Sequence, residues 1–368
     1  MSYEKIKDVS IYVGPSCNFN CSYCDRAYVK NVGVDAAVCD PALVDFVVDV
    51  YEKAESKPMI SFHGGETLVY IKTVKKIVEA VLERIPDFQS VFYIQTNGSL
   101  ILKHKEFFEN HKDVLYVSIS YDFNFQGENR TEFDIEATLQ FLNELGIQVH
   151  LQYVIPTNQK GVFDISVYAT IVRLYKRYKI QRLILILLRH IRHADRFETV
   201  IADEKLDLKK FFLGFMQFVQ LLYVAGIKMA IDGHATTIDK NYYQNHKQMV
   251  LAPNGMIVPE YQFIEYGDYD FTIGRWKPFV EISRDVMPPK ARAKIRSECV
   301  GCAMTELCGL RYHYAMFGID PPAPTRCKEF YSLNMMAIRH LYKLNEQPTL
   351  LHHLGIQNDQ QHPQDRES

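Results

Sequence analysis

The sequence predicts an α/β protein built on a parallel β-sheet. Segments typical of strands alternate about six times with segments in which apolar residues recur at helical spacing. The apolar segment at residues 183–188 is continuous, as in a strand that helices cover on both faces. Such repeats form parallel sheets with right-handed crossovers. Ligand-binding groups are therefore expected at the carboxyl ends of the strands, where glycine-rich and polar segments follow.

The elements are expected in a regular order. The predicted strands are rich in β-branched, aromatic and aliphatic residues and cover residues 9–13, 58–62, 91–95, 115–120, 149–155 and 183–188. Apolar spacing predicts helices at residues 40–53, 70–84, 136–145, 167–178 and 332–342. Pro41 suits the start of the first helix, and Gly146 suits the end of the third.

The domain organisation is expected to have four parts. Residues 1–200 form the first domain, and a long amphipathic helix within residues 201–230 bridges to a second domain at residues 231–345. Residues 346–368 form a polar tail that is expected to be disordered.

The composition disfavours several classes of protein. The chain has 368 residues, 47% of them hydrophobic, and a net charge of −2, which gives no bulk electrostatic attraction to nucleic acid or membranes. The N-terminus lacks the apolar region of a signal peptide, and no apolar run approaches the ~20 residues of a membrane span. We therefore expect a soluble cytoplasmic protein with no membrane partner.

Three of the eight cysteines follow the first strand. Cys17, Cys21 and Cys24 have C-x3-C-x2-C spacing, after Gly14-Pro15-Ser16 breaks the strand. Three thiolates on one loop can bind three irons of a [4Fe–4S] cluster and leave the fourth iron open. Structural zinc, or thiols that bind no metal, is the alternative. Cys39 stands alone and is expected to be a packed thiol.

Four more cysteines lie near the other end of the chain. Cys299, Cys302 and Cys308 have C-x2-C-x5-C spacing, and Cys327 follows them. Four thiolates can bind a complete cluster or a zinc ion, so both remain open on spacing alone. The clustering of the cysteines argues for metal binding over disulfides.

The first cysteine motif, with Tyr23 before its last cysteine, resembles the signature of the radical S-adenosylmethionine (SAM) superfamily. The resemblance implies a partial (β/α)6 TIM-like barrel in which the open iron chelates SAM. An electron from the cluster then cleaves SAM to a 5′-deoxyadenosyl radical, which abstracts a substrate hydrogen. It also implies a cofactor-binding set of Tyr23, Gly64, Gly65, Glu66, Asn97 and Ser120.

The later cysteines resemble the SPASM or twitch extension of that superfamily, which carries auxiliary [4Fe–4S] clusters. In a complete SPASM domain two further cysteines would stand at Glu260, after a hairpin at residues 249–259, and at Tyr312. The resemblance therefore implies a degenerate extension with the distal auxiliary cluster alone, bound by Cys299, Cys302, Cys308 and Cys327. Glu260, Tyr261 and Tyr312 are then candidate catalytic groups for proton transfer; the alternative is that they only fill space.

Basic segments offer candidate substrate contacts. Residues 189–196 follow the last predicted strand, where a substrate would sit. Residues 173–196 and 290–296 could also contact phosphates, although a solvated helix face is the better explanation of the second segment.

Three function hypotheses follow. The first is a radical SAM enzyme that modifies a peptide or protein side chain; the cysteine loop begins at residue 17, which leaves no room before it for a leader-binding domain. The second is an isomerase, epimerase or dehydrogenase acting on a small molecule or nucleotide, including hypermodified thymidine in phage DNA. The third, a non-enzymatic Fe–S or zinc protein, is disfavoured by the ordered SAM-like motifs. Either enzyme would need a reductant such as flavodoxin or ferredoxin.

Overall fold

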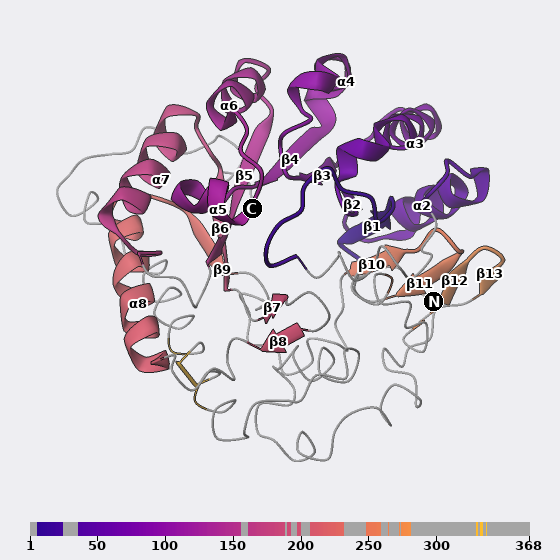
Figure 1. Cartoon of the computed structure of the whole chain (residues 1–368). Helices are drawn as coiled ribbons and strands as arrows, with labels where there is room; N and C mark the ends of the chain where they lie inside the picture. Colours follow the sequence, from indigo (N-terminus) through magenta and orange to yellow (C-terminus); the bar gives the residue numbers. More distant parts are fainter. Residues whose placement is uncertain are drawn as a thin grey trace.

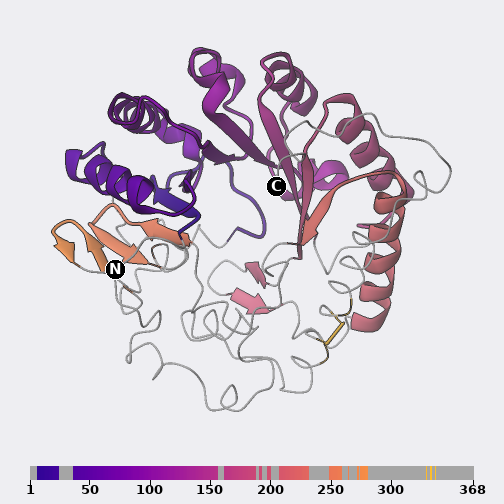
Figure 2. The ribbon, with the colours of Figure 1, turned by 180° about the vertical axis from the view of Figure 1, so that it is seen from behind.

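The structure is a computed structural model, and most of the first 231 residues are described. The described residues are 6–24, 36–155, 161–187, 190–192, 197–199, 207–231, 248–258, 264, 272, 274–280, 329, 332, 333 and 336. In Figures 1 and 2 the strands form an arc with the helices along its outer side.

One curved sheet dominates the described part of the chain. Its strands have the order β13-β12-β11-β10-β1-β2-β3-β4-β5-β6-β9, and all neighbours from β10 to β9 are parallel. The central strands are β1 (Asp8–Tyr12), β2 (Met59–His63), β3 (Phe92–Thr96), β4 (Leu115–Ser120), β5 (Gln148–Ile155) and β6 (Arg182–Leu187). The outer strands are β9 (Met229–Ile231), β10 (Gln248–Leu251), β11 (Met256–Val258), β12 (Gly274–Trp276) and β13 (Phe279–Val280). A separate antiparallel pair joins β7 (His190–Arg192) and β8 (Phe197–Thr199).

Helices connect successive parallel strands. The longer ones are α2 (Pro41–Lys53), α3 (Ile71–Arg84), α4 (Lys105–His111), α6 (Ile135–Glu144), α7 (Ile165–Arg177) and α8 (Leu208–Val224). The short ones are η1 (Thr67–Tyr70), η2 (Leu102–His104), η3 (Lys112–Val114), η4 (Phe123–Phe125) and α5 (Gln126–Asn129). Aspartates cap three of the longer helices, because the carboxylates of Asp40, Asp134 and Asp207 accept a backbone N–H in the first turn of α2, α6 and α8.

The two faces of the sheet have different chemistry. Alternate residues such as Val9, Ile11 and Phe62 are buried and join the helices in one apolar core. Because side chains alternate along a strand, their neighbours point to the concave inner face. On β1 to β5 most of these inner residues are polar, and several of them are half-buried: His63, Tyr93, Gln95, Tyr116, Ser120 and His150. The sheet therefore presents a polar, partly accessible surface inside the arc.

The predicted parallel α/β sheet is confirmed, and each of the six predicted strands is present within a residue at either end. The hairpin predicted at residues 249–259 is also present as β10 and β11. Several short elements, α4 and β9 among them, were not predicted. These two have seven and three residues, too few for a periodic pattern to stand out.

The helix predicted as a bridge between domains has another position. α8 is a crossover helix between β6 and β9, and β9 pairs parallel with β6. The sheet therefore extends beyond the predicted boundary at residue 200, because its β9 and β10 strands come after α8. The predicted boundary at residue 345, the tail and the basic segment at 290–296 lie outside the described residues, as does most of the helix predicted at 332–342.

No helix within the described ranges is both long and apolar enough to cross a membrane.

Replacing Phe215 with Ala tests the packing of α8. Phe215 is 0% exposed and its ring lies 5.9 Å from that of Phe163, so the cavity should cost about 3–5 kcal/mol of unfolding free energy. Leu213→Ala on the same helix is the control, because Leu213 is 54% exposed. Chemical denaturation measures both. Equal effects would contradict a packed crossover helix.

Candidate functional site

The cysteine loop leaves β1 and turns into the interior of the arc (Figure 1). Cys21 is buried, Cys17 and Cys24 are half-buried, and none of the three is in a disulfide. The backbone N–H of Phe19 donates to Cys17 Sγ over 3.3 Å, and the N–H of Cys24 donates to the Cys21 carbonyl over 3.2 Å. These two hydrogen bonds help to shape the loop that carries the three thiols.

The glycines after β2 allow the cysteine loop to approach closely. Gly65 N–H donates to the Gly14 carbonyl over 2.8 Å, and Glu66 N–H donates to the Ser16 carbonyl over 2.9 Å. A Cβ on Gly65 would lie 2.2 Å from the Pro15 carbonyl oxygen, and one on Gly64 would lie 2.6 Å from that of Gly14. Only glycine fits at these two positions without moving backbone.

Glu66 joins the ends of β2 and β3. Its side chain is 2% exposed, and Oε1 accepts from Leu68 N–H at 2.9 Å and from the Thr96 hydroxyl at 2.5 Å. Oε2 accepts from Asn97 N–H at 2.7 Å. Burial raises the pKa of this carboxyl, and these hydrogen bonds oppose the rise. Oε2 keeps acceptor capacity for one more donor.

Asn97 connects β3 to the cysteine loop. Its Nδ2 donates to Asn18 Oδ1 over 2.9 Å and lies 4.0 Å from Cys17 Sγ. Its Oδ1 accepts from both the N–H and the hydroxyl of Ser99, at 3.0 and 2.7 Å. The sequence-predicted residues Cys17, Gly65, Glu66 and Asn97 are therefore brought into one hydrogen-bonded assembly.

Tyr23 lies on the other side of the loop. Its hydroxyl donates to Asp122 Oδ2 over 2.6 Å, just beyond the end of β4. Asp122 is 0% exposed, and burial raises its pKa to about 6 although the nearby Arg130 opposes the rise. Burial also raises the pKa of the Tyr23 hydroxyl. The loop is thus fixed to the segment that follows β4 as well as to β2 and β3.

Ser120 ends β4 on the polar inner face. Its hydroxyl donates to Gln152 Oε1 over 3.1 Å, and Gln95 Nε2 donates to the same oxygen over 3.3 Å. His63 Nε2 lies 3.1 Å from Ser61 Oγ, and Ser61 donates to Asp8 Oδ1 over 2.6 Å. Hydroxyl, amide and imidazole groups therefore lie on the inner face near the carboxyl ends of β2 to β5.

An aromatic group lies deeper on the same face, nearer the amino ends of the strands. Tyr116 hydrogen-bonds to His150 Nε2, and the ring of Tyr93 lies 5.7 Å from that of Tyr116. Burial, followed by the charge of Arg182, lowers the pKa of His150 to about 4. His150 is therefore neutral near pH 7.

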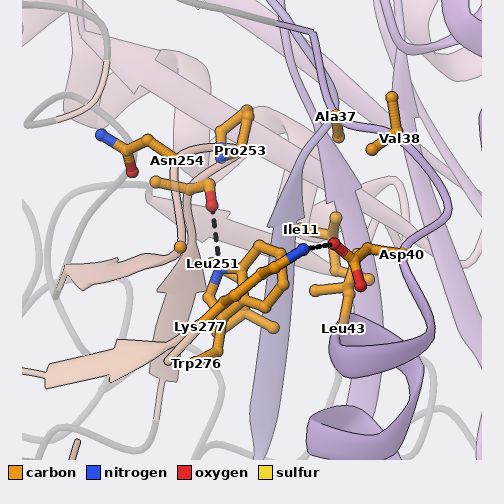
Figure 3. A pocket seen from close by; sticks show the side chains of 12 residues that line it. Ile11, Ala37, Val38, Asp40, Leu43, Leu251, Pro253, Asn254, Trp276 and Lys277 are labelled. Atoms are coloured by element: carbon orange, nitrogen blue, oxygen red, sulfur yellow. Dashed lines mark hydrogen bonds and ion pairs between the residues drawn. The ribbon is translucent and has the colours of Figure 1, made fainter. Parts of the chain in front are cut away.

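A separate cavity of about 410 Å³ lies on the helix-covered side of β1 (Figure 3). The Lys277 ammonium pairs with Asp40 across it, and Trp276 Nε1 donates to the Ala252 carbonyl over 2.8 Å. None of the sequence-predicted site residues lines this cavity.

Other predicted site residues lie outside the described residues. These are the three proton-transfer candidates, the four later cysteines and most of the basic segment after β6: Glu260, Tyr261, Tyr312, Cys299, Cys302, Cys308, Cys327 and residues 189–196. Of that segment only the backbone of β7 is described.

Three of the described cysteines lie on one short loop, an arrangement that an iron–sulfur cluster can use. Within the described residues, no three His, Cys, Asp or Glu side chains are grouped to hold one ion. A [4Fe–4S] cluster makes a different demand, because each thiolate binds a separate iron. Three thiols on one short loop, with no fourth cysteine beside them in the described chain, suit a cluster with one open iron.

Sequence reasoning missed two charged residues of this site, Asp122 and Arg130. Asp122 lies two residues after the strand predicted at residues 115–120, so its position near a strand end was a usable signal. Arg130 lies at the C-terminal end of the four-residue helix α5, which no periodic pattern marks. Its place beside the cysteine loop results from tertiary structure.

Comparison with models of known protein families finds a match within the first half of the chain. Residues 11–159 match the family model described as "Radical SAM superfamily". A relative from Methanocaldococcus jannaschii, "Uncharacterized protein MJ0907", is 28% identical over 120 residues, which are 32% of this chain and 40% of that protein. The alignment thus spans less than half of that relative's length.

Solved structures with a similar fold include SAM-bound proteins. The structure titled "Native anSMEcpe with bound AdoMet" has a TM-score of 0.62 at 17% identity and covers 92% of this chain and 100% of its own. Its complex "with bound AdoMet and Kp18Cys peptide" has a TM-score of 0.62 at 16% identity, covering 91% and 99%. Streptococcus suis SuiB bound to S-adenosylmethionine has a TM-score of 0.55 at 18% identity, covering 82% and 70%. At such identities the likeness establishes the fold.

Gly65→Ala tests the contact between the two loops. The added Cβ meets backbone oxygens, which cannot move like a flexible side chain, so we expect a loss of about 3 kcal/mol or more in unfolding free energy. Gly146→Ala is the control, because no atom lies within 4 Å of the Cβ that would be added there. Only the left-handed backbone conformation of Gly146 should then lower the unfolding free energy, by about 1–2 kcal/mol. Denaturant unfolding compares them. A smaller loss at Gly65 than at Gly146 would contradict the close approach.

Proposed function

Since the chain is an enzyme of the radical SAM superfamily, we propose that it binds a [4Fe–4S] cluster through Cys17, Cys21 and Cys24 and modifies a peptide or protein side chain. The observation that carries this proposal is the hydrogen-bonded assembly of the cysteine loop with Glu66 and Asn97. When bound, the cluster would supply the electron that cleaves SAM to a 5′-deoxyadenosyl radical, which abstracts a substrate hydrogen.

The chain's own residues would hold and orient the cofactors. Gly64, Gly65 and Glu66 keep the cysteine loop against β2, and the free acceptor capacity of Glu66 Oε2 suits the ammonium group of SAM. Asn97 fixes the side of the loop that carries Cys17, and Tyr23 fixes the side that carries Cys24. Ser120, at the end of β4, is the remaining proposed SAM contact.

The polar inner face supports a polar substrate. His63, Gln95 and Ser120 are half-buried on this face near the carboxyl ends of their strands. A ligand there would meet hydrogen-bonding groups, and the apolar side chains of the core lie on the other face. Peptide backbone and polar side chains suit such a surface, because its donors and acceptors need partners when water is displaced.

A peptide or protein is the substrate class that we favour. The similar anSMEcpe structure was solved with a peptide, and SuiB was solved with its precursor peptide SuiA. These peptides are bound by those two proteins. Because this chain shares their fold, we propose a peptide or protein as its substrate as well.

One sequence feature favours a second candidate, an isomerase, epimerase or dehydrogenase that acts on a small molecule or nucleotide, including hypermodified thymidine in phage DNA. Glu260 and Tyr312 stand where a complete SPASM domain has cysteines. We propose that the degenerate extension retains only the auxiliary cluster of Cys299, Cys302, Cys308 and Cys327, and that Glu260, Tyr261 and Tyr312 serve proton transfer. Without the nearer cluster, the redox-neutral reactions of this class, isomerisation and epimerisation, are favoured over dehydrogenation, because they remove no electron from the substrate.

The proposed setting is the cytoplasm, where thiols stay reduced. Flavodoxin or ferredoxin is the proposed electron donor.

SAM cleavage by the reconstituted enzyme tests the proposal. Protein reconstituted with iron and sulfide should form 5′-deoxyadenosine from SAM and dithionite. Replacing Cys17, Cys21 or Cys24 with Ala should abolish the product, because each is a proposed cluster ligand. Cys39→Ala is the matched control and should retain activity. Liquid chromatography with mass spectrometry measures the product. An iron-loaded wild-type protein that forms none would refute the proposal.

The iron content separately tests the auxiliary cluster. Two clusters require about eight irons per chain, whereas about four would refute the ligand set proposed at the later cysteines.

A further inference from the structure

Arg130 places a buried positive charge beside the cysteine loop. Its side chain is only 9% exposed, and although burial raises the pKa of the nearby Cys21 thiol, the positive charge of Arg130 opposes that rise. The guanidinium carbon also lies 5.9 Å from the centre of the Phe19 ring, two residues before Cys21. A charged group this buried normally has a partner that stabilises it.

The local fold fixes Arg130 in this position. Arg130 N–H donates to the Gln126 carbonyl over 2.8 Å, which closes the short helix α5. Its neighbour Asn129 accepts from the Ser22 backbone N–H over 2.9 Å through its carbonyl. The segment that carries Arg130 is therefore bonded directly to the loop that carries Cys21.

Asp122 supplies the partner charge. Its Oδ1 lies 3.8 Å from Arg130 Nη1, and Asp122 is 0% exposed. Its other oxygen accepts from the Tyr23 hydroxyl. The cation thus lies beside the part of the loop that carries Phe19 and Cys21, whereas the anion contacts the loop at Tyr23, one residue before Cys24. The two charges lie close enough to the loop for either to act on a bound cluster.

We infer that Arg130 is a positioning residue for the cluster, one that holds the Cys21 sulfur and raises the reduction potential of the iron, with Asp122 opposing it. This inference rests on the cluster proposed above. Hydrogen bonds to ligand sulfurs and nearby net charge are established determinants of Fe–S potentials. Reduction adds negative charge, so a buried cation stabilises the reduced cluster and a buried anion destabilises it.

The test is the midpoint potential of the cluster whose electron paramagnetic resonance (EPR) signal changes when SAM is added. In full-length reconstituted protein, Arg130→Gln should shift this potential to more negative values and lower the iron retained against a chelator. Asp122→Asn should shift it to more positive values. Arg130→Lys keeps the charge and should lie nearer the wild type than Arg130→Gln. Arg177→Gln is the control, because Arg177 is exposed and paired with Glu136.

Opposite signs separate this role from a merely structural one, which would shift both variants alike. If Arg130→Gln does not fold or load iron, the test rests on Asp122→Asn and Arg130→Lys. A positive shift of the midpoint potential in Asp122→Asn supports the inference, and an unchanged potential in that variant overturns it. Unchanged potentials in both charge variants, with a SAM-responsive wild type, would overturn this inference alone. A wild-type protein without a SAM-responsive signal would overturn the proposed function as well.

Discussion

The buried carboxylate of Glu66 is the point at which three parts of the site meet. It accepts hydrogen bonds from the end of β3 and from η1, while its own backbone N–H donates to the cysteine loop. Burying this charge is unfavourable unless the carboxylate accepts its hydrogen bonds, so the segments that follow β2 and β3 must come together. The backbone N–H of the same residue then ties the cysteine loop to them. That coupling fixes the loop against the sheet, and the loop in turn fixes the thiols.

The same sheet explains how a reactive site can be open to substrate and still rest on a stable fold. Its outer face is apolar and covered by helices, which supplies the hydrophobic stabilisation. Its inner face carries Ser61, Gln95 and Gln152, whose hydrogen bonds run from strand to strand. Because this inner face is polar, the space inside the arc can stay accessible and need not be filled by apolar side chains. The cysteine loop lies at the edge of this inner face, near the polar residues at the carboxyl ends of the strands.

Local patterns in the sequence predicted the strands and most of the helices, whereas the candidate site residues came from the resemblance to the radical SAM superfamily. Glycines at 64 and 65 were among those residues, and the structure shows which backbone they meet. Sequence patterns did not predict short elements, or positions that depend on tertiary contacts. β9 is too short to recognise, α8 looked like a bridge because its partner strand was missed, and Arg130 owes its role to a segment folded back on the loop. Glu66, a candidate cofactor-binding residue, lies against the cysteine loop, but the three hydrogen bonds that its carboxylate accepts could not be predicted from spacing.

The central claim is that the assembly around Glu66 holds three thiolates so that one iron of the cluster stays open for SAM. Mössbauer spectroscopy of protein loaded with iron-57 measures this directly, in a variant with Cys299 and Cys302 replaced by Ala to remove the auxiliary cluster. Adding SAM should change the isomer shift of one iron and leave the others unchanged. Four irons that stay equivalent with and without SAM would contradict the account.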